Sequence, residues 1–170
     1  MSVGPLIVSG QWKGALMHDS IIPLSALVGT WHGAGVASYP TMSDFAYSDE
    51  VTFTDIGKPL LAYSQRTWTT EGRLMHVETG YLRVVGEGRV EIVVAIPSGQ
   101  TELGSGEFSS DDAGVFISTD AAVQVTPTAK AVDRIVRSYR CDGGTLTYDM
   151  AMAAVGVGLT AHLHSELTKD

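Results

Sequence analysis

The sequence predicts an all-β protein, a closed up-and-down antiparallel β-barrel with one short helix near its N-terminus. Short strand-like segments follow one another along the chain, separated by tight turn signals. No helices alternate with these segments, so a parallel sheet is disfavoured. The 170 residues suit one domain and include nineteen glycines, which fit strands that bend around a barrel. A β-sandwich is the alternative architecture.

The N-terminal region predicts a loose arm over residues 1–18, followed by the barrel domain over residues 19–170. A short helix begins near Asp19, with Ser20 as its expected cap and Pro23 in its first turn. Gly29 is expected to end this helix.

We expect about ten strands in the rest of the chain. Turns are predicted at Asp55-Ile56-Gly57, Pro97-Ser98-Gly99 and Asp142-Gly143-Gly144, among other places. The segments with strand character are Thr30–Ala37, Phe45–Phe53, Leu60–Trp68, Leu74–Glu78, Gly80–Val85, Val90–Ile96, Thr101–Phe108, Gly114–Thr119, Arg134–Cys141, Thr145–Val155 and Leu159–Leu167.

Composition excludes several classes of site and partner. Cys141 is the only cysteine, which rules out an internal disulfide, a thiolate zinc cluster and a cysteine-ligated iron–sulfur cluster. The formal charge of -8 and the lack of a basic cluster argue against nucleic acid and anionic membranes as partners. No apolar run approaches the ~20 residues that cross a bilayer, and the N-terminus does not resemble a secretion signal. We therefore expect a cytoplasmic protein.

Alternation along two strands points to a cavity and to candidate ligands. Tyr148, Met150 and Met152 share one strand face, which is either ordinary core or the wall of an apolar pocket. His162, His164 and Glu166 also alternate. That set can be a solvated polar face, a zinc site, or a haem site that needs a single imidazole.

A third strand carries His76, which alternates with Leu74 and Glu78. A lone histidine on a strand is most simply interpreted as structural or exposed. The segment by itself therefore assigns His76 no chemistry.

The segment Gly29-Thr30-Trp31-His32-Gly33-Ala34-Gly35-Val36-Ala37-Ser38-Tyr39-Pro40-Thr41 resembles the signature of the nitrobindin family. In that signature Trp31 can plug one end of a barrel, and Gly33 and Gly35 remove bulk where a planar group comes close. Further similar blocks follow in the family order, so the resemblance extends from about residue 20 to the C-terminus. They are Glu50–Phe53, Ser64–Trp68, Met75–Arg83 and Ala161–Leu163.

The resemblance implies a ten-stranded, calycin-like barrel, related in shape to fatty-acid-binding proteins, that binds one ferric haem b per chain. The axial histidine of the family matches His162, which would hold the haem iron. The threonine that contacts the haem matches Thr41, and Met75, His76 and Met152 fall at cavity-lining positions. The resemblance also implies nitric oxide binding, isomerisation of peroxynitrite to nitrate, and an apolar haem face opposite the axial histidine.

Three points stay open at this stage. The same barrel could serve as a non-enzymatic carrier of a fatty acid or another small hydrophobic ligand, and the chain could be a monomer or a homodimer. Ala37 stands where the family commonly has glycine. If His162 points inward, His164 and Glu166 should follow unless the strand is bulged or lies at the barrel rim; we expect the rim.

Overall fold

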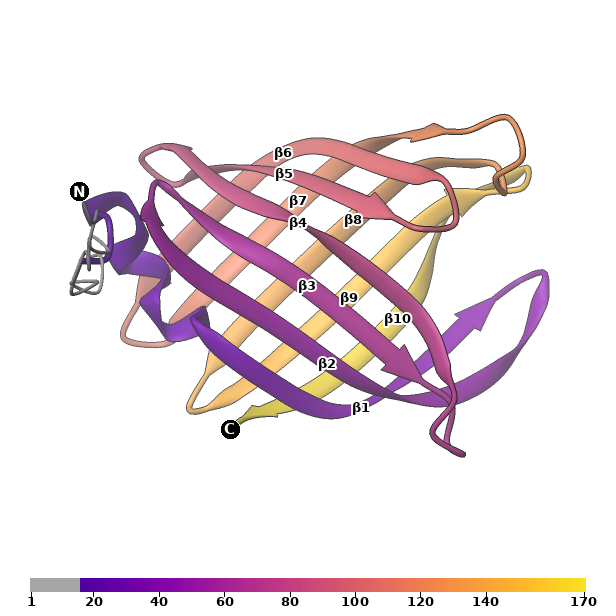
Figure 1. Cartoon of the computed structure of the whole chain (residues 1–170), viewed down its shortest axis with the longest axis horizontal. Helices are drawn as coiled ribbons and strands as arrows, with labels where there is room; N and C mark the ends of the chain where they lie inside the picture. The colour runs from indigo at the N-terminus through magenta and orange to yellow at the C-terminus, as the bar shows by residue number, and fades with distance from the viewer. Residues whose placement is uncertain (1–15) are drawn as a thin grey trace, which may run out of the picture.

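The computed structural model describes residues 16–170 as ten antiparallel strands that close into a barrel (Figure 1). Each strand pairs with its neighbours in the chain, and β1 pairs with β10 to complete the ring. The predicted up-and-down barrel is thereby confirmed, and the sandwich is excluded. The strands are β1 (Gly29–Tyr39), β2 (Met42–Lys58), β3 (Leu60–Trp68), β4 (Leu74–Gly86), β5 (Arg89–Ile96), β6 (Gln100–Asp111), β7 (Gly114–Val125), β8 (Val132–Asp142), β9 (Thr145–Ala154) and β10 (Val157–Lys169).

Two strands run through positions where the sequence predicted a break. The segments expected on either side of Thr79 form the single strand β4, and Gly80 pairs with Val94 inside it. A Cβ at Gly80 would collide with the backbone of Val93, so glycine here permits close pairing rather than a turn. Similarly, β2 continues through the predicted turn at Asp55-Ile56-Gly57, where its register with β3 shifts.

A nine-residue 3-10 helix, η1 (Asp19–Leu27), lies across one end of the barrel (Figure 1). Its cap is His18, whose Nδ1 accepts a hydrogen bond from the Ser20 amide at 3.2 Å; the prediction of Ser20 as the cap was wrong. The imidazole accepts the capping hydrogen bond that was expected to go to the Ser20 hydroxyl. Residues 1–15 of the predicted arm lie outside the described residues.

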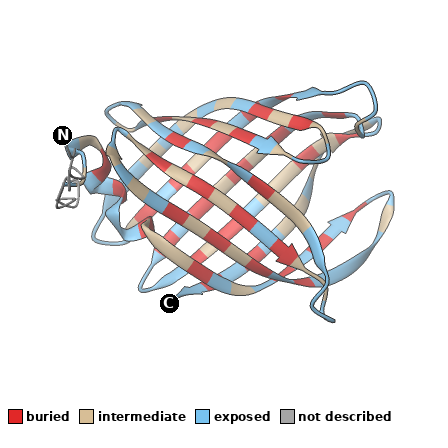
Figure 2. Ribbon diagram, viewed as in Figure 1, coloured by how far each residue is buried: buried red, intermediate tan, exposed pale blue. Residues whose placement is uncertain are grey.

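The barrel is packed solid at the η1 end. Ile21, Leu24 and Leu27 are fully buried, and they pack in one cluster with Trp31 and apolar side chains from the strands. The Trp31 indole donates to the Leu27 carbonyl at 2.8 Å, which confirms the predicted plug. Figure 2 shows buried and less buried residues alternating along the strands, as expected when one face of each strand points into the barrel.

The opposite end carries the turns that follow β1, β3, β5, β7 and β9. Four strand pairs near this end shift register, at Met75 in β4, at Asp133 in β8, at His162 in β10 and between Ala37 and Tyr39 in β1. Such bulges break the strict in-and-out alternation of side chains and gather at barrel rims. Among the described residues, no helix is long and apolar enough to cross a membrane.

Candidate functional site

A cavity of about 260 Å³ lies inside the end of the barrel opposite to η1. This volume is close to the lower end of the range for small-molecule pockets, about 300 Å³. Its walls are mostly apolar, and exposed lining residues such as Met75 and Lys130 mark the side that opens to solvent. The apolar lining residues are Phe45, Met75, Ile96, Val132, Ile135, Met150, Met152 and Leu163.

The bulge in β10 is what brings His162 into this cavity. Ala161 pairs with Ala151 and Leu163 pairs with Met150, so His162 is the extra residue between them. Both His162 and Leu163 therefore line the cavity, although neighbours on a regular strand face opposite ways. The expected rim was not the explanation, because the bulge itself resets the alternation.

Beyond the bulge, His164 and Glu166 face outward. Both are exposed, and Nδ1 of His164 lies 2.7 Å from Oδ1 of Asp149 on β9. The two imidazoles thus sit on opposite faces of the sheet and cannot share a zinc ion. Within residues 16–170, no group of three or more potential ligands is arranged to hold a metal ion.

The His162 ring is fixed by the segment that ends β1. Its Nδ1 lies 3.0 Å from the Ser38 carbonyl oxygen, and its ring packs edge-on against Tyr39, with centroids 5.2 Å apart. A carbonyl oxygen only accepts hydrogen bonds, so Nδ1 must carry the proton. The neutral ring then presents the lone pair of Nε2, the nitrogen left to bind a metal.

Burial keeps this ring neutral. Desolvation is the largest influence and lowers the pKa of His162; the hydrogen bond to Ser38 acts in the opposite direction, and the charges of Lys130 and His76 lower the pKa further. A neutral imidazole is the form that ligates a metal. The environment of His162 is therefore set for coordination near neutral pH.

The other predicted site residues divide into two groups. Met75, His76 and Met152 line the cavity, as expected. Met75 is the bulge residue of β4, so it reaches the cavity beside His76 instead of on the opposite face. Thr41 lies exposed in the turn between β1 and β2, outside the set that lines the cavity, and its contact with a ligand stays a prediction.

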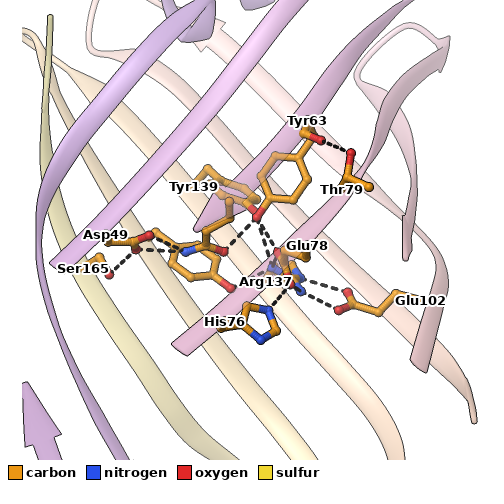
Figure 3. Close-up of polar contacts among 11 residues, drawn as sticks. Asp49, Tyr63, His76, Glu78, Thr79, Glu102, Arg137, Tyr139 and Ser165 are labelled. Carbon is orange, nitrogen blue, oxygen red and sulfur yellow. Dashed lines mark hydrogen bonds and ion pairs between the residues drawn. The ribbon is translucent and has the colours of Figure 1, made fainter. Parts of the chain in front are cut away.

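The floor of the cavity is a buried polar cluster centred on Arg137 of β8 (Figure 3). Arg137 is 1% exposed and donates to both carboxylate oxygens of Glu78, at 2.6 and 3.0 Å. The guanidinium also pairs with Glu102 and donates to the Tyr148 hydroxyl at 2.8 Å. Tyr63 donates to Glu78 at 2.5 Å, so each member of this Arg137 cluster has a partner.

The charge balance holds Glu78 ionised despite its burial. Burial alone would raise its pKa, but Arg137 and the hydrogen bonds from His76 and Arg137 outweigh that effect and hold the pKa well below its usual range. Asp49 behaves differently: burial is the largest influence and raises its pKa, against hydrogen bonds from Gln65 and Ser165. The interior therefore keeps Glu78 charged beside the cavity.

The residues that hold the site's side chains in place were not predicted from the sequence. Ser38 and Tyr39 hold His162, and no local motif relates them to a histidine more than 120 positions away. Arg137 did leave a signal, because it alternates with the buried residues Ile135 and Tyr139 on a strand. An arginine at an inward position of an otherwise apolar strand face indicates a buried ion pair.

The glycines of the β1 signature have a different role from the expected one. A Cβ at Gly33 would collide with the backbone of β10 at Glu166, and a Cβ at Gly35 would collide with the ring of Tyr47. The planar group expected there is thus the protein's own tyrosine and peptide chain. Ala37 is fully buried and pairs with Leu163, so its methyl group occupies interior space.

The residues present fit a haem. An imidazole with a free Nε2 projects into the cavity, most of the wall is aliphatic or thioether, and the mouth is open to solvent. One axial imidazole and an apolar slot are what a five-coordinate haem requires of a protein. Lys130 at the mouth offers a cation to the carboxylates that a haem carries at one edge.

Comparisons with known proteins find a haem-binding family model and similar named proteins. The family model described as THAP4-like, heme-binding beta-barrel domain matches residues 20–169. "Peroxynitrite isomerase 2" of Mycobacterium ulcerans (strain Agy99) is 42% identical over 155 residues, which cover 90% of this chain and 96% of that protein. "Peroxynitrite isomerase 2" of Mycobacterium bovis (strain BCG / Pasteur 1173P2) is 46% identical over 152 residues, covering 86% and 93%.

A solved structure gives the same result for the fold. The crystal structure of Rv2717c from M. tuberculosis superimposes with a TM-score of 0.88 and is 40% identical in sequence. The match covers 91% of this chain and 99% of that one.

Proposed function

This chain belongs to the THAP4-like haem-binding β-barrel family, the nitrobindin family, and on that premise we propose that it binds ferric haem b and isomerises peroxynitrite to nitrate. One observation carries the proposal. The β10 bulge turns His162 into an apolar cavity, with Nδ1 occupied by Ser38 and Nε2 left free. Relatives named peroxynitrite isomerase, at 42–46% identity, support the reaction.

The chain's own residues bind and orient the cofactor. His162 would hold the haem iron through Nε2, because the Ser38 carbonyl holds the ring in the tautomer that leaves this nitrogen free. Met75, His76 and Met152 form walls against the macrocycle, and we retain Thr41 as a contact from the turn between β1 and β2. One haem per chain follows from one such histidine in one cavity.

The apolar walls matter for the reaction as well as for binding. When bound, ferric haem supplies a Lewis-acidic iron at which the O–O bond of peroxynitrite can break and nitrate can form. Met150, Met152 and Leu163, on β9 and β10, would limit the access of water to the haem on the side of His162. The same open cavity admits nitric oxide, which we propose as a second small ligand.

A fatty-acid carrier is the weaker interpretation of the same barrel. A carrier that buries the carboxylate of a fatty acid needs a free cation at the inner end of the cavity. Arg137 is the cation at that position, and Glu78 and Glu102 already neutralise it. The cavity floor therefore presents no free positive charge to a fatty acid.

The test compares His162→Ala with His164→Ala, a control on the outer face of the same strand. Haem titration of the wild type and of His164→Ala should give the Soret band of a five-coordinate ferric haem, and His162→Ala should lose it while keeping its β-sheet circular dichroism. The loaded wild type should speed peroxynitrite decay with nitrate as product, and nitric oxide should shift its spectrum. An unchanged spectrum in His162→Ala would contradict the proposal, as would displacement of a bound fluorescent fatty acid with no haem uptake.

We further propose that the protein acts in the cytoplasm as a monomer or a homodimer. The acidic surface supports the first point, because its formal charge of -8 favours solubility. Size-exclusion chromatography with light scattering measures the mass of the haem-loaded form. A larger assembly would contradict the second point.

A further inference from the structure

The wall of the cavity opposite His162 carries a second histidine. His76 lies on β4 and His162 on β10; three strands separate them one way around the barrel and five the other way. In a ring of ten strands these positions are almost diametrically opposed. A planar group ligated by His162 from one wall therefore turns its other face toward the wall of His76.

His76 leaves Nδ1 free, which is the ring nitrogen that is hydrogen-bonded in His162. Its Nε2 lies 3.0 Å from Oε2 of Glu78, and the ionised carboxylate only accepts hydrogen bonds, so Nε2 carries the proton. Nδ1 is then the free nitrogen of His76, whereas Nε2 is the free nitrogen of His162. The cavity thus holds two imidazoles with opposite ring nitrogens available (Figure 3 shows the His76 side).

Glu78 cannot move away from His76. It is 2% exposed and held by two hydrogen bonds from Arg137 and one from Tyr63. Buried ion pairs of this kind add little stability over apolar packing, so a functional reason for retaining one is worth testing. Rigid second partners are also what fixes the orientation of a working side chain.

Acidic side chains predominate in the protein interior behind His76. Glu78 and Glu102 outnumber the single guanidinium of Arg137 in the cluster behind His76, and Asp49 lies nearby with Gln65 and Ser165 as partners. Lys130 and His162 are the other basic groups of the cavity wall. A weak acid entering the cavity can transfer its proton to Nδ1, leaving an anion that faces an imidazolium backed by Glu78.

We propose that His76, fixed by Glu78, takes the proton of a small weak acid at Nδ1 and then donates it as a hydrogen bond to the resulting anion, on the side of the haem opposite His162. Under the proposed function, on which this inference rests, that anion is peroxynitrite. The opposite face is then not purely apolar, in contrast to what the family resemblance implied. His76 is a ligand-binding residue, and Glu78 is a positioning residue that acts through it.

The experiment measures azide binding to the ferric, haem-loaded protein. Azide is a small anion whose acid form carries one proton, so it probes the same interaction without turnover. Hydrogen bonds to charged groups predict that His76→Leu weakens azide binding by roughly tenfold to hundredfold. The matched control is His164→Leu, which removes a carboxylate-paired histidine on the outer face and should leave the affinity unchanged.

A second measurement reads the Glu78 contact without haem. Long-range ¹H–¹⁵N spectra of the apoprotein should show His76 protonated at Nε2 and His162 protonated at Nδ1. In Glu78→Gln the amide can donate to His76, so the His76 signal should change tautomer while that of His162 does not. A merely structural role of Glu78 would not move one histidine alone.

The outcomes separate the two proposals. If the wild type takes up no haem, the proposed function fails, and the role of His76 fails with it. If haem binds but His76→Leu keeps wild-type azide affinity, only the inference on His76 is overturned. Tighter azide binding in His76→Leu, with loss of a six-coordinate spectrum, would show that His76 itself competes for the iron and would also overturn it.

Discussion

The two ends of the barrel are built from the same strands but have opposite interiors. At one end η1 covers the opening, and the side chains of Leu24, Leu27 and Trp31 are almost completely buried beneath it. At the other end the side chains do not fill the interior, and His162 and Met152 line the cavity that remains. The buried Arg137 cluster lies between the two.

Alternation alone therefore does not decide whether inward-facing residues form a packed core or line a cavity. Inward-facing apolar residues occur at both ends, but only the η1 end receives a covering segment of its own chain. At the cavity end, bulges at Met75 and His162 place adjacent residues on the same wall. Local breaks in the strand pattern thus create the functional site on a regular scaffold.

The largest effect is expected from a substitution in the Arg137 cluster, which lies between the two ends. Arg137→Met leaves Glu78 and Glu102 buried without a cation, which should lower the free energy of unfolding by about 3–5 kcal/mol. Urea denaturation of the apoprotein measures this loss. The control is Arg134→Met on the same strand, whose pair with Asp120 is exposed and screened by solvent; equal effects of the two variants would contradict the assignment.

A leucine pair compares the two ends directly. Leu24→Ala removes a fully buried side chain beneath η1 and should cost about 2–5 kcal/mol of unfolding free energy. Leu163→Ala, on the wall of the cavity, should cost less than half as much because its surroundings are already incompletely packed. A larger loss at Leu163 would mean that the cavity end is as tightly packed as the η1 end.

The smallest effect concerns acid. Burial lowers the pKa of His162, so the neutral ring persists below the ordinary histidine value of about 6.5. Haem affinity should stay constant above that pH and then fall about tenfold per pH unit once pH drops below the lowered pKa, because protonation competes with iron. Haem dissociation followed at the Soret band checks this; a midpoint above about 6.5 would contradict it.

Most of the fold could be predicted because strand alternation and turn residues are local signals. The error at Gly80 arose because glycine marks close strand contacts as well as turns. At Asp55-Ile56-Gly57 the turn signal is real, since Gly57 has a φ of 69° and donates to Asp55, but it makes an irregularity inside β2 instead of ending the strand. His162 was predicted as a ligand from the family resemblance, and in the structure the bulge in β10 brings its side chain to the cavity wall. Bulges depend on pairing between distant strands and leave no local signal.

The supporting residues of the site depend on the same long-range pairing. Ser38 meets His162, and Glu78 meets Arg137, only when the barrel closes. Strand alternation predicts that Arg137 points into the barrel. It does not predict which carboxylates pair with Arg137. The opposite tautomers of His76 and His162 were likewise out of reach of the sequence, because each follows from a partner fixed in space.

The most direct test is a crystal structure of the haem-loaded protein, which identifies the atom that binds the iron. The iron should bond to Nε2 of His162, while Nδ1 of that ring keeps its hydrogen bond to the Ser38 carbonyl. Iron bound instead by His76, by His164 or by Nδ1 of His162 would contradict the account.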